Sequence, residues 1–283
     1  MLYYAVYDTV SCQNLRIRVS KKQEDIVVFL KLTFLFLTGS LCGWVLELFY
    51  RRFFCGNNPE RRWINPGFLV GPYVPLYGFG LCILYLLARL PLPGPQAVTV
   101  LLQLLIITVA LTGIELLAGL LAEWIGHVRL WDYSDRWGNY RGLICPLFSA
   151  AWAALGAGYL FFLDPFMSAA VDRLSLRPGI LFPEGILYGI LLVDLGYSTH
   201  VLTRIRKLAD EYQIEVRYEE LKAHIHHLHA SNPIRQRLWT FALPLNEGPL
   251  PEHLRQYVAR LSADGRLAEL RRRVKKHSRK NKE

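Results

Sequence analysis

Residues 97–122 read AVTVLLQLLIITVALTGIELLAGLLA, a continuous apolar stretch in which Glu115 is the sole charged residue. A helix that crosses the hydrocarbon core of a bilayer needs about 20 apolar residues. Similar stretches occur at about 32–50, 68–88, 143–163 and 179–202. We therefore predict an all-α, polytopic membrane helix bundle of about five spans.

The composition agrees with this prediction, because 52% of the residues are hydrophobic and the mean hydropathy is +0.20. Soluble domains usually have roughly 45–50% apolar residues. We predict a polar N-terminal segment at 1–25 and a transmembrane domain at 26–203. Because the N-terminal segment is not followed by a short apolar stretch with a small-residue cleavage site, we expect no removable signal peptide. Residues 204–283 form a basic tail that we expect to be helical and cytoplasmic.

The charge distribution predicts the orientation in the membrane. Of the net charge of +10, most lies in residues 204–283, which carry 18 Lys and Arg against 10 Asp and Glu. Because Lys and Arg are retained on the cytoplasmic side, we expect a protein of the cell inner membrane with its tail inside and its N-terminus outside. Four basic residues near the N-terminus oppose this orientation: Arg16, Arg18, Lys21 and Lys22. An N-inside chain with a missed or re-entrant span is the alternative.

The loop after the first span is similar to the loop after the third. The first span ends GWVLE at residues 43–47, and its loop runs to WINPGFL at residues 63–69. The third span ends GLLAE at residues 119–123, and its loop runs to WGNYRGLI at residues 137–144. The glutamate and the tryptophan are 16 residues apart in one copy and 14 in the other.

This similarity predicts an internal repeat of two spans, with copies at about 34–90 and 97–163 and an extra span at 179–203. An even number of spans per copy gives both copies the same orientation in the membrane. Both loops are therefore expected on one face, the cytoplasmic one.

Residues four apart share one face of a helix. Two such stripes end the first and third spans: Gly39, Gly43 and Glu47, and Glu115, Gly119 and Glu123. Small residues at this spacing let membrane helices approach closely, so we expect the acids to face the bundle interior, with the glycine stripes as a possible surface for a homo-oligomer. An acid as deep as Glu115 costs roughly 2.5–3.5 kcal/mol, which indicates a buried functional or pairing role. For Glu47 and Glu123, which lie near helix ends, the alternative to a functional role is contact with headgroup water or a pair with Arg51 or Arg129.

Proline and glycine open the second span of each copy: Pro66, Gly67, Gly71, Pro72 and Pro75, then Gly142 and Pro146. Proline removes a backbone donor, and in lipid the groups it frees must be satisfied by protein, water or ligand. Transporters build binding sites from such broken helices, whereas the alternative is a proline-rich helix start without a function. We predict these substrate-binding residues: Glu47, Glu115, Glu123, Asn65, Asn139, Asp132, Arg141, Tyr73 and Tyr77. Asp194 in the fifth span is a further candidate for a buried functional or pairing role.

The same segments resemble a known family. GWVLE at 43–47, NPGFLVGPYVPLYG at 65–78, LWDYS at 130–134 and GLIC at 142–145, with Asn139, are similar to the bacterial membrane family catalogued as putative ABC-transporter type IV. The resemblance covers roughly residues 34–162. The family's more usual Asn-Arg-Gly stands here as Asn-Pro-Gly.

The resemblance implies a transport permease. Because the chain contains no G-x-x-x-x-G-K-[ST] motif, the ATP-hydrolysing subunit is expected to be a separate partner. One alternative is a membrane-embedded enzyme that acts on lipid-linked substrates through Glu47, Glu123, Asp132 and Arg141. Another is a scaffold or sensor without transport activity. We predict no catalytic residue, no cofactor and no metal.

In the tail, apolar residues at helical spacing between Val201 and Leu228 predict that the fifth helix continues as an amphipathic or coiled-coil stalk, another surface for a homo-oligomer, up to Pro233. A second helix is expected at about 251–276, ending RRRVKK. Basic residues there are attracted to anionic lipid at about 1 kcal/mol per charge, while the lack of interleaved aromatic residues argues against nucleic acid.

Histidine and cysteine are among the residue types that bind metals. Four histidines form i, i+3 pairs on the stalk, His224, His226, His227 and His229. We expect them on a solvated face, since no cysteine lies nearby to complete a metal site. The five cysteines show no C-x-x-C pair and are expected to be reduced.

Overall fold

The computed structural model describes residues 2–54, 58, 61, 63–126, 128–175, 177–212, 216–218, 220, 221, 224 and 249–266, with most side chains from Gln23 onward. The side chains of Cys12 and of the four basic residues before Gln23 lie outside what the structure describes, as do Cys55, His226, His227, His229, Pro233 and the basic run at 271–276. The described cysteines, Cys42, Cys82 and Cys145, are free thiols.

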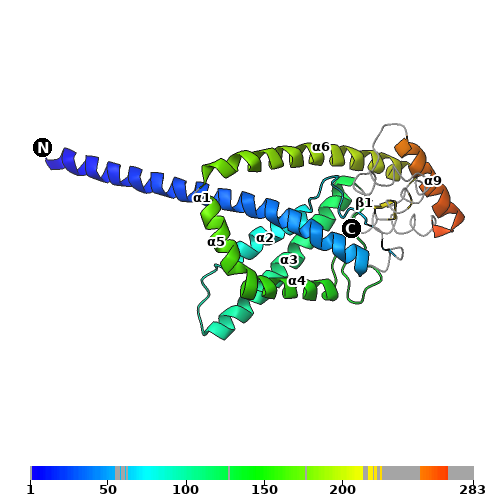
Figure 1. Cartoon of the computed structure of the whole chain (residues 1–283), viewed down its shortest axis with the longest axis horizontal. Helices are drawn as coiled ribbons and strands as arrows, with labels where there is room; N and C mark the ends of the chain where they lie inside the picture. The colour runs from blue at the N-terminus through cyan, green and yellow to red at the C-terminus, as the bar shows by residue number, and fades with distance from the viewer. Residues whose placement is uncertain are drawn as a thin grey trace.

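The chain forms a bundle of long helices with a smaller, partly stranded unit at one end (Figure 1). In chain order the elements are α1 (Leu2–Phe53), α2 (Pro75–Leu87), α3 (Gln96–Gly126), β1 (Val128–Arg129), α4 (Pro146–Gly158), the π-helical turn η1 (Tyr159–Leu163), α5 (Asp164–Ser175), the 3-10 turn η2 (Pro178–Ile180), α6 (Leu181–Tyr212), β2 (Val216–Arg217) and α9 (Pro249–Ala263). The predicted helical bundle is therefore confirmed for the main part of the chain.

Four helical segments are long and apolar enough to cross a membrane: Gln23–Phe53, Gln96–Ile125, Pro146–Leu174 and Leu181–Tyr212. The second span predicted from sequence corresponds to α2, which has 13 residues. At 1.5 Å per residue α2 is about 20 Å long, whereas the hydrocarbon core is about 30 Å thick. By helix length alone, the structure has four spanning helices among the described residues and one shorter apolar helix.

The helix α2 begins at Pro75 rather than at Phe68, where the sequence predicted it. Pro75 stands in the first turn, where its missing N–H is no loss. Before it, Gly67 has a φ of +75° and Pro72 has no N–H to donate, so the chain from 66 to 74 is not helical. This non-helical segment, residues 66–74, packs into the bundle with Leu69 and Tyr73 buried.

The helix α3 shows how the bundle faces lipid. Apolar side chains at four-residue spacing are exposed along one face: Leu101, Leu105, Val109, Leu117 and Leu121. On the opposite face Ile107, Leu111, Glu115 and Gly119 are buried. The expected interior position of the acidic stripe is therefore what the structure shows.

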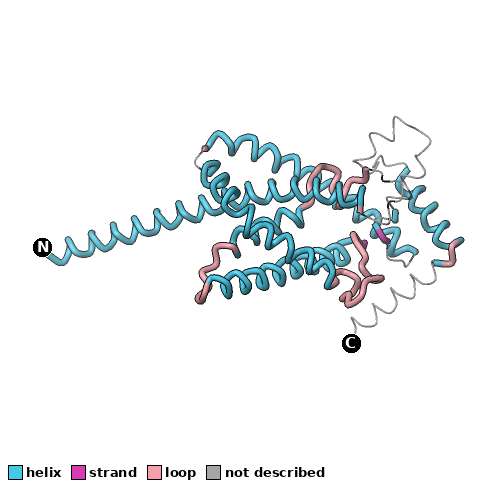
Figure 2. The backbone as a smooth tube through the Cα atoms, turned by 60° about the horizontal axis from the view of Figure 1, so that its bottom comes forward, coloured by secondary structure: helices cyan, strands magenta, loops and turns pink. Residues whose placement is uncertain are grey.

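The long loops lie at one end of the bundle, beside the small stranded unit (Figure 2). There α1, α3 and α6 end and α2 and α4 begin. The start of α1 protrudes from the other end, far from α9 (Figure 1).

The tail is packed against this loop end. The helix α6 ends at Tyr212, so the predicted continuous stalk is interrupted, and β2 then pairs in parallel with β1. A shared core joins α6, both strands and α9: Val128, Val201, Leu202, Ile205, Val216, Tyr218, Leu221, Tyr257, Val258 and Leu261. His224 is buried against Tyr257 rather than on the solvated face that we expected, with ring centroids 5.9 Å apart.

Candidate functional site

Glu115 lies inside the bundle, where the residue is 3% exposed. The Tyr133 hydroxyl donates a hydrogen bond to one carboxylate oxygen at 3.1 Å. The Trp152 indole N–H donates to the other oxygen at 2.9 Å. Among the described residues no lysine or arginine forms an ion pair with it. Glu115 is thus a buried acid held by neutral donors.

A second acid, Glu47 at the end of α1, is connected to Glu115 through aromatic side chains. The Tyr77 hydroxyl donates to Glu47 at 2.9 Å, and the Arg51 Nε donates to its other oxygen at 3.0 Å. The Tyr77 ring lies 5.6 Å from the Trp152 ring, centroid to centroid. We refer to Glu47, Tyr77, Glu115, Tyr133 and Trp152 as the acid cluster. It draws on α1, α2, α3, α4 and the loop after β1.

The helices come close enough to form the acid cluster because small residues line α1. A Cβ atom on Gly43 would lie 2.2 Å from the Tyr77 side chain. Such a contact is far inside van der Waals distance, so glycine is required for Tyr77 to reach Glu47.

The remaining acids at the loop end form a separate set of ion pairs. Glu123 at the end of α3 pairs with Arg129 at 3.2 Å and with Arg141 at 3.4 Å. Asp132 pairs with Arg129 at 3.4 Å and with Arg217 of β2 at 2.8 Å. Through Glu220 the pairs continue to Arg266 in the tail. We refer to Glu123, Arg129, Asp132, Arg141, Arg217, Glu220 and Arg266 as the ion-pair network.

The electrostatics of the loop fit these two sets. Burial opposes ionisation of Asp132, but hydrogen bonds from Ser134 and the charges of Arg217 and Arg129 outweigh it and hold the pKa of the carboxyl below its usual range. Burial, together with the charge of Glu115, raises the pKa of the Tyr133 hydroxyl. Tyr133 therefore remains a hydrogen-bond donor at neutral pH.

The non-helical segment is held by two polar side chains. Asp194, on α6, accepts hydrogen bonds from the Val70 amide at 3.0 Å and the Gly71 amide at 2.7 Å. The Asn65 side chain donates to the Leu69 and Val70 carbonyls and accepts from the Trp44 indole. Backbone groups that are not in a helix are thus satisfied by protein inside the bundle, as a lipid environment requires.

The structure divides the predicted site residues into three groups. Glu47, Glu115 and Tyr77 come together in the acid cluster, and Glu123, Asp132 and Arg141 in the ion-pair network. The remaining three, Asn65, Asn139 and Tyr73, support loops. Asn65 holds the non-helical segment, and Asn139 donates to the Ser134 and Arg136 carbonyls and accepts from the Gly142 amide. The Tyr73 ring is buried with Leu37, Leu69 and Leu191. No group of three or more metal-ligating side chains occurs within the part of the chain that the structure describes.

Sequence reasoning did not include Trp152 and Tyr133 among the site residues. Trp152 lies within an apolar span, where its N–H needs an acceptor, and a buried acid on another span is the natural one. Tyr133 follows Asp132 directly in the Trp-Asp-Tyr-Ser motif. The need of each buried polar group for a partner was the signal that could have identified them.

A bundle with four membrane-capable helices, a lipid-facing surface and a buried acid cluster defines a polytopic α-helical membrane protein. A family model described as putative ABC-transporter type IV matches residues 34–199, which is more than half of the chain. The chain belongs to this family, as the Trp-Asp-Tyr-Ser and Gly-Pro-Tyr motifs predicted. No curated protein and no solved structure matches the chain.

Proposed function

We propose that the chain is the membrane permease component of a transport system, that a separate ATPase drives it, and that the acid cluster binds its solute. The family description supports a transport role. The observation that carries the assignment of the site is Glu115, a buried acid on a membrane-spanning helix whose partners are neutral.

The acid cluster is suited to a cationic solute. A charged side chain at this depth costs roughly 2.5–3.5 kcal/mol, and such residues in membrane helices commonly mark solute or ion pathways. Glu115 supplies negative charge, while the rings of Tyr77 and Trp152 lie beside it and offer faces that attract cations. Glu47 supplies a second carboxylate, which Arg51 partly neutralises.

The adjacent loop offers a route from an ATPase to this site. Asp132 belongs to the ion-pair network, which reaches the tail through Arg217, and the next residue, Tyr133, donates to Glu115. A force applied to the tail or the loop would therefore move a donor of the acid cluster.

The proposed orientation has the loops and the tail in the cytoplasm and the start of α1 outside the inner membrane. In this arrangement α2 and the non-helical segment together complete a fifth crossing, since α1 and α3 both end on the loop side. The internal repeat is part of the proposal, with support from Gly67 and Gly142, which occupy matching positions in the two loops and have φ values of +75° and +73°.

The enzyme alternative required Glu47, Glu123, Asp132 and Arg141 to act together. Glu123, Asp132 and Arg141 belong to the ion-pair network, whereas Glu47 pairs with Arg51 and accepts from Tyr77. The scaffold alternative rests on the tail as an independent unit. Because the tail shares a core with β1 and α6, it is less separate than that alternative supposes.

Binding is tested by thermal stabilisation, since a ligand that binds the native state raises its unfolding temperature. The detergent-purified protein is heated with methylammonium, guanidinium or tetraethylammonium, each compared with sodium at equal ionic strength. We expect at least one cation to stabilise the wild type and not Glu115→Gln. The exposed Glu252→Gln of α9 serves as the matched control and should respond like wild type.

The partner is tested by purification of the protein from its native membranes under mild conditions. An ATPase should co-purify with it. If no cation distinguishes wild type from Glu115→Gln and no ATPase co-purifies, the transport proposal fails.

A further inference from the structure

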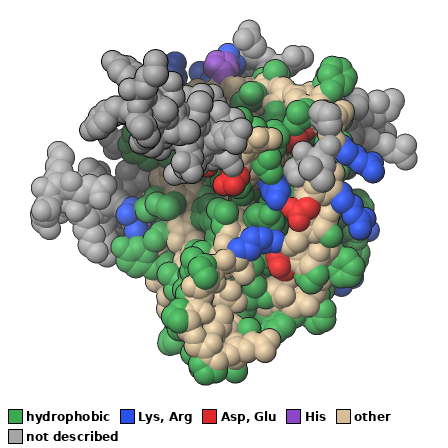
Figure 3. All heavy atoms as spheres, turned by 90° about the vertical axis from the view of Figure 1, so that its left-hand side faces the viewer, with side chains coloured by type: hydrophobic (Ala, Val, Ile, Leu, Met, Phe, Trp, Pro, Cys, Tyr) green, Lys and Arg blue, Asp and Glu red, His purple; other side chains and the backbone are tan. Residues whose placement is uncertain are grey.

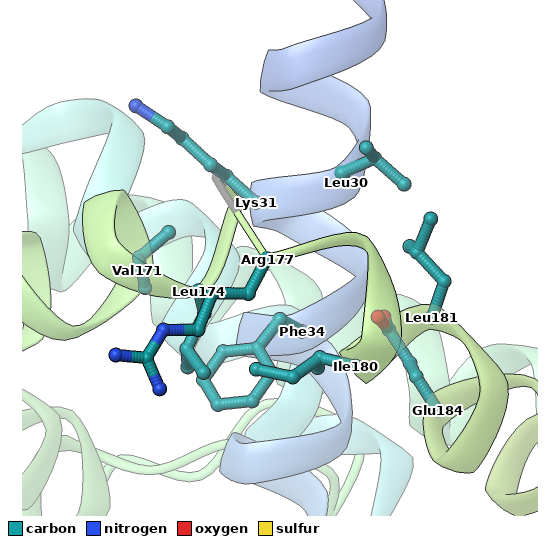
Figure 4. Close-up of a pocket in the computed structure, with 9 residues that line it drawn as sticks. All are labelled: Leu30, Lys31, Phe34, Val171, Leu174, Arg177, Ile180, Leu181 and Glu184. Carbon is teal, nitrogen blue, oxygen red and sulfur yellow. The ribbon is translucent and has the colours of Figure 1, made fainter.

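A cavity of about 170 Å³ lies where α1 passes the junction of α5 and α6, at the end of the bundle opposite the tail. Most of its wall is apolar, with Phe34 from α1, Val171 from α5 and Leu181 from α6. Three polar side chains line it as well, Lys31, Arg177 and Glu184, and Figure 4 shows them around the cavity. Viewed from this end, acidic and basic side chains lie among hydrophobic ones (Figure 3).

Glu184 is the unusual group in this cavity. The residue is 9% exposed, and its Oε1 is buried without a hydrogen-bond partner among the described residues. In Figure 4 the carboxylate lies between Ile180 and Leu181, facing the cavity. Burial of an ionised carboxylate without a donor is strongly unfavourable. The site therefore lacks a donor, and a ligand that carries N–H groups and a positive charge would supply it.

The basic residues of the cavity divide into one that is paired and one that is available. Lys31 pairs with Asp172 at 2.6 Å, so its charge is already balanced. Arg177 is exposed, and its guanidinium forms no ion pair with any acid that the structure describes. The cavity thus presents a buried negative group and, on the opposite side of Phe34, an accessible positive group (Figure 4). This is the complement of a zwitterion whose ammonium enters and whose phosphate remains outside.

We propose that this cavity binds an ethanolamine-phosphate headgroup, with its ammonium on Glu184 and its phosphate on Arg177. Arginine donates to phosphate in a fork geometry that suits this role. The apolar surface beside the cavity is exposed, including Phe29, Leu181 and Phe182, and would contact acyl chains when the headgroup belongs to a lipid. A choline headgroup has no N–H donor, and a glycerol headgroup has no cation. The site therefore selects ethanolamine from among these.

Competition measured by native mass spectrometry tests the selection. Purified protein is mixed with equal amounts of phosphatidylethanolamine, phosphatidylcholine and phosphatidylglycerol that share the same acyl chains. We expect wild type to retain the ethanolamine lipid roughly tenfold over the other two, the effect of one charged hydrogen-bonded pair. Glu184→Gln should lose this preference, whereas Glu24→Gln, an exposed acid on α1, should keep it.

A second variant and a soluble probe complete the test. Arg177→Gln changes an exposed side chain and should weaken binding of the ethanolamine lipid roughly tenfold by removing the phosphate partner. Soluble phosphoethanolamine that stabilises wild type but not Glu184→Gln, without any lipid preference, would support the headgroup chemistry and identify a free compound as its source. A preference that survives Glu184→Gln, unchanged binding in Arg177→Gln, or no response of wild type to either form of ethanolamine phosphate would overturn the proposal.

Discussion

A single carboxylate on α6, that of Asp194, accounts for much of the irregular backbone in the bundle. It accepts from two consecutive amides, Val70 and Gly71, and from the Ser198 hydroxyl at 3.0 Å. Amides outside a helix have no partner of their own, and in lipid each one left unsatisfied is costly. Asp194 therefore accepts the hydrogen bonds of backbone amides in the non-helical segment, as backbone carbonyls do within the helices of the bundle.

Replacement of Asp194 by asparagine should destabilise the protein by about 1–3 kcal/mol, because the amide nitrogen cannot accept the hydrogen bond that one carboxylate oxygen accepts. The measurement is the unfolding temperature in detergent. Asp210→Asn is the matched control on the same helix. Its pair with Arg206 spans 3.8 Å and is half exposed, so its loss should change stability little. Equal effects of the two variants would contradict the role of Asp194.

Asp132 predicts a pH dependence with a definite sign. Its pKa is depressed in the folded protein, so its contribution to stability is fully present above the unfolded value of about 3.9 and is lost as the pH falls through the lower, folded value. Asp132→Asn should lower the unfolding temperature at pH 7. The difference between wild type and this variant should shrink below about pH 3.9.

The neighbouring Asp135 provides the control for that measurement, since it is exposed in the same loop. Asp135→Asn should leave the unfolding temperature unchanged across the pH range. A difference between wild type and Asp132→Asn that is as large at pH 3 as at pH 7 would show that the charge of Asp132 is not what matters.

At the scale of elements, the approach of α1 to α2 depends on glycine. A Cβ atom added to Gly39 would lie 2.8 Å from the Leu81 side chain and from the Tyr77 carbonyl oxygen. A Cβ atom added to Gly43 would lie still closer to the Tyr77 side chain. Overpacking of a close interface typically costs about 1–3 kcal/mol. We expect Gly43→Ala to destabilise the protein by at least this range and to displace Tyr77 from Glu47.

The same substitution at Gly113 provides a matched comparison, because nothing lies within 4 Å of an added Cβ there. Alanine favours the helix over glycine by up to about 1 kcal/mol, so Gly113→Ala should be neutral or stabilising. Unfolding temperatures of the two variants in detergent decide the matter. If both alanine variants behaved alike, close packing of α1 on α2 would not be the reason for Gly43.

The sequence predicted the long helices well and the short elements poorly, for physical reasons. A continuous apolar run such as 97–122 determines a spanning helix by itself, and the stripe at Glu115 follows from helical periodicity. The non-helical segment before α2 is held instead by Asp194, which is distant in sequence. The strands β1 and β2 have two residues each and pair across a long sequence separation, so no local pattern indicated them.

The candidate site shows the same division. The sequence predicted that Glu115 lies deep in a membrane-spanning helix, because it is the sole charged residue of the apolar stretch 97–122. It also named Arg129 as a partner for Glu123, which the structure shows, but it did not reveal the second pair with Arg141, since that pair depends on the fold of the loop. The position of an acid along a helix follows from the sequence of that helix, whereas its full set of partners depends on how the other elements pack around it.

At the scale of the whole molecule, the two ends of the bundle have opposite characters. The loop end contains the ion-pair network and the core that joins the tail to β1, and the other end contains the short connection between α2 and α3 and the cavity around Glu184. The non-helical segment and α2 lie between these ends. Whether they cross the bilayer decides whether the chain has five crossings or four.

Labelling of single cysteines in sealed vesicles tests whether α3 crosses the bilayer and which face carries the tail. In a variant with its natural cysteines replaced, we introduce Asp135→Cys in the loop, Ser262→Cys in α9 and Gln96→Cys at the start of α3, all at exposed positions. A membrane-impermeant maleimide should reach the first two from the cytoplasmic face and the third from the opposite face. Labelling of Gln96→Cys and Asp135→Cys from one face would mean that α3 does not cross. Labelling of Ser262→Cys from the outside would reverse the orientation that the basic tail predicts.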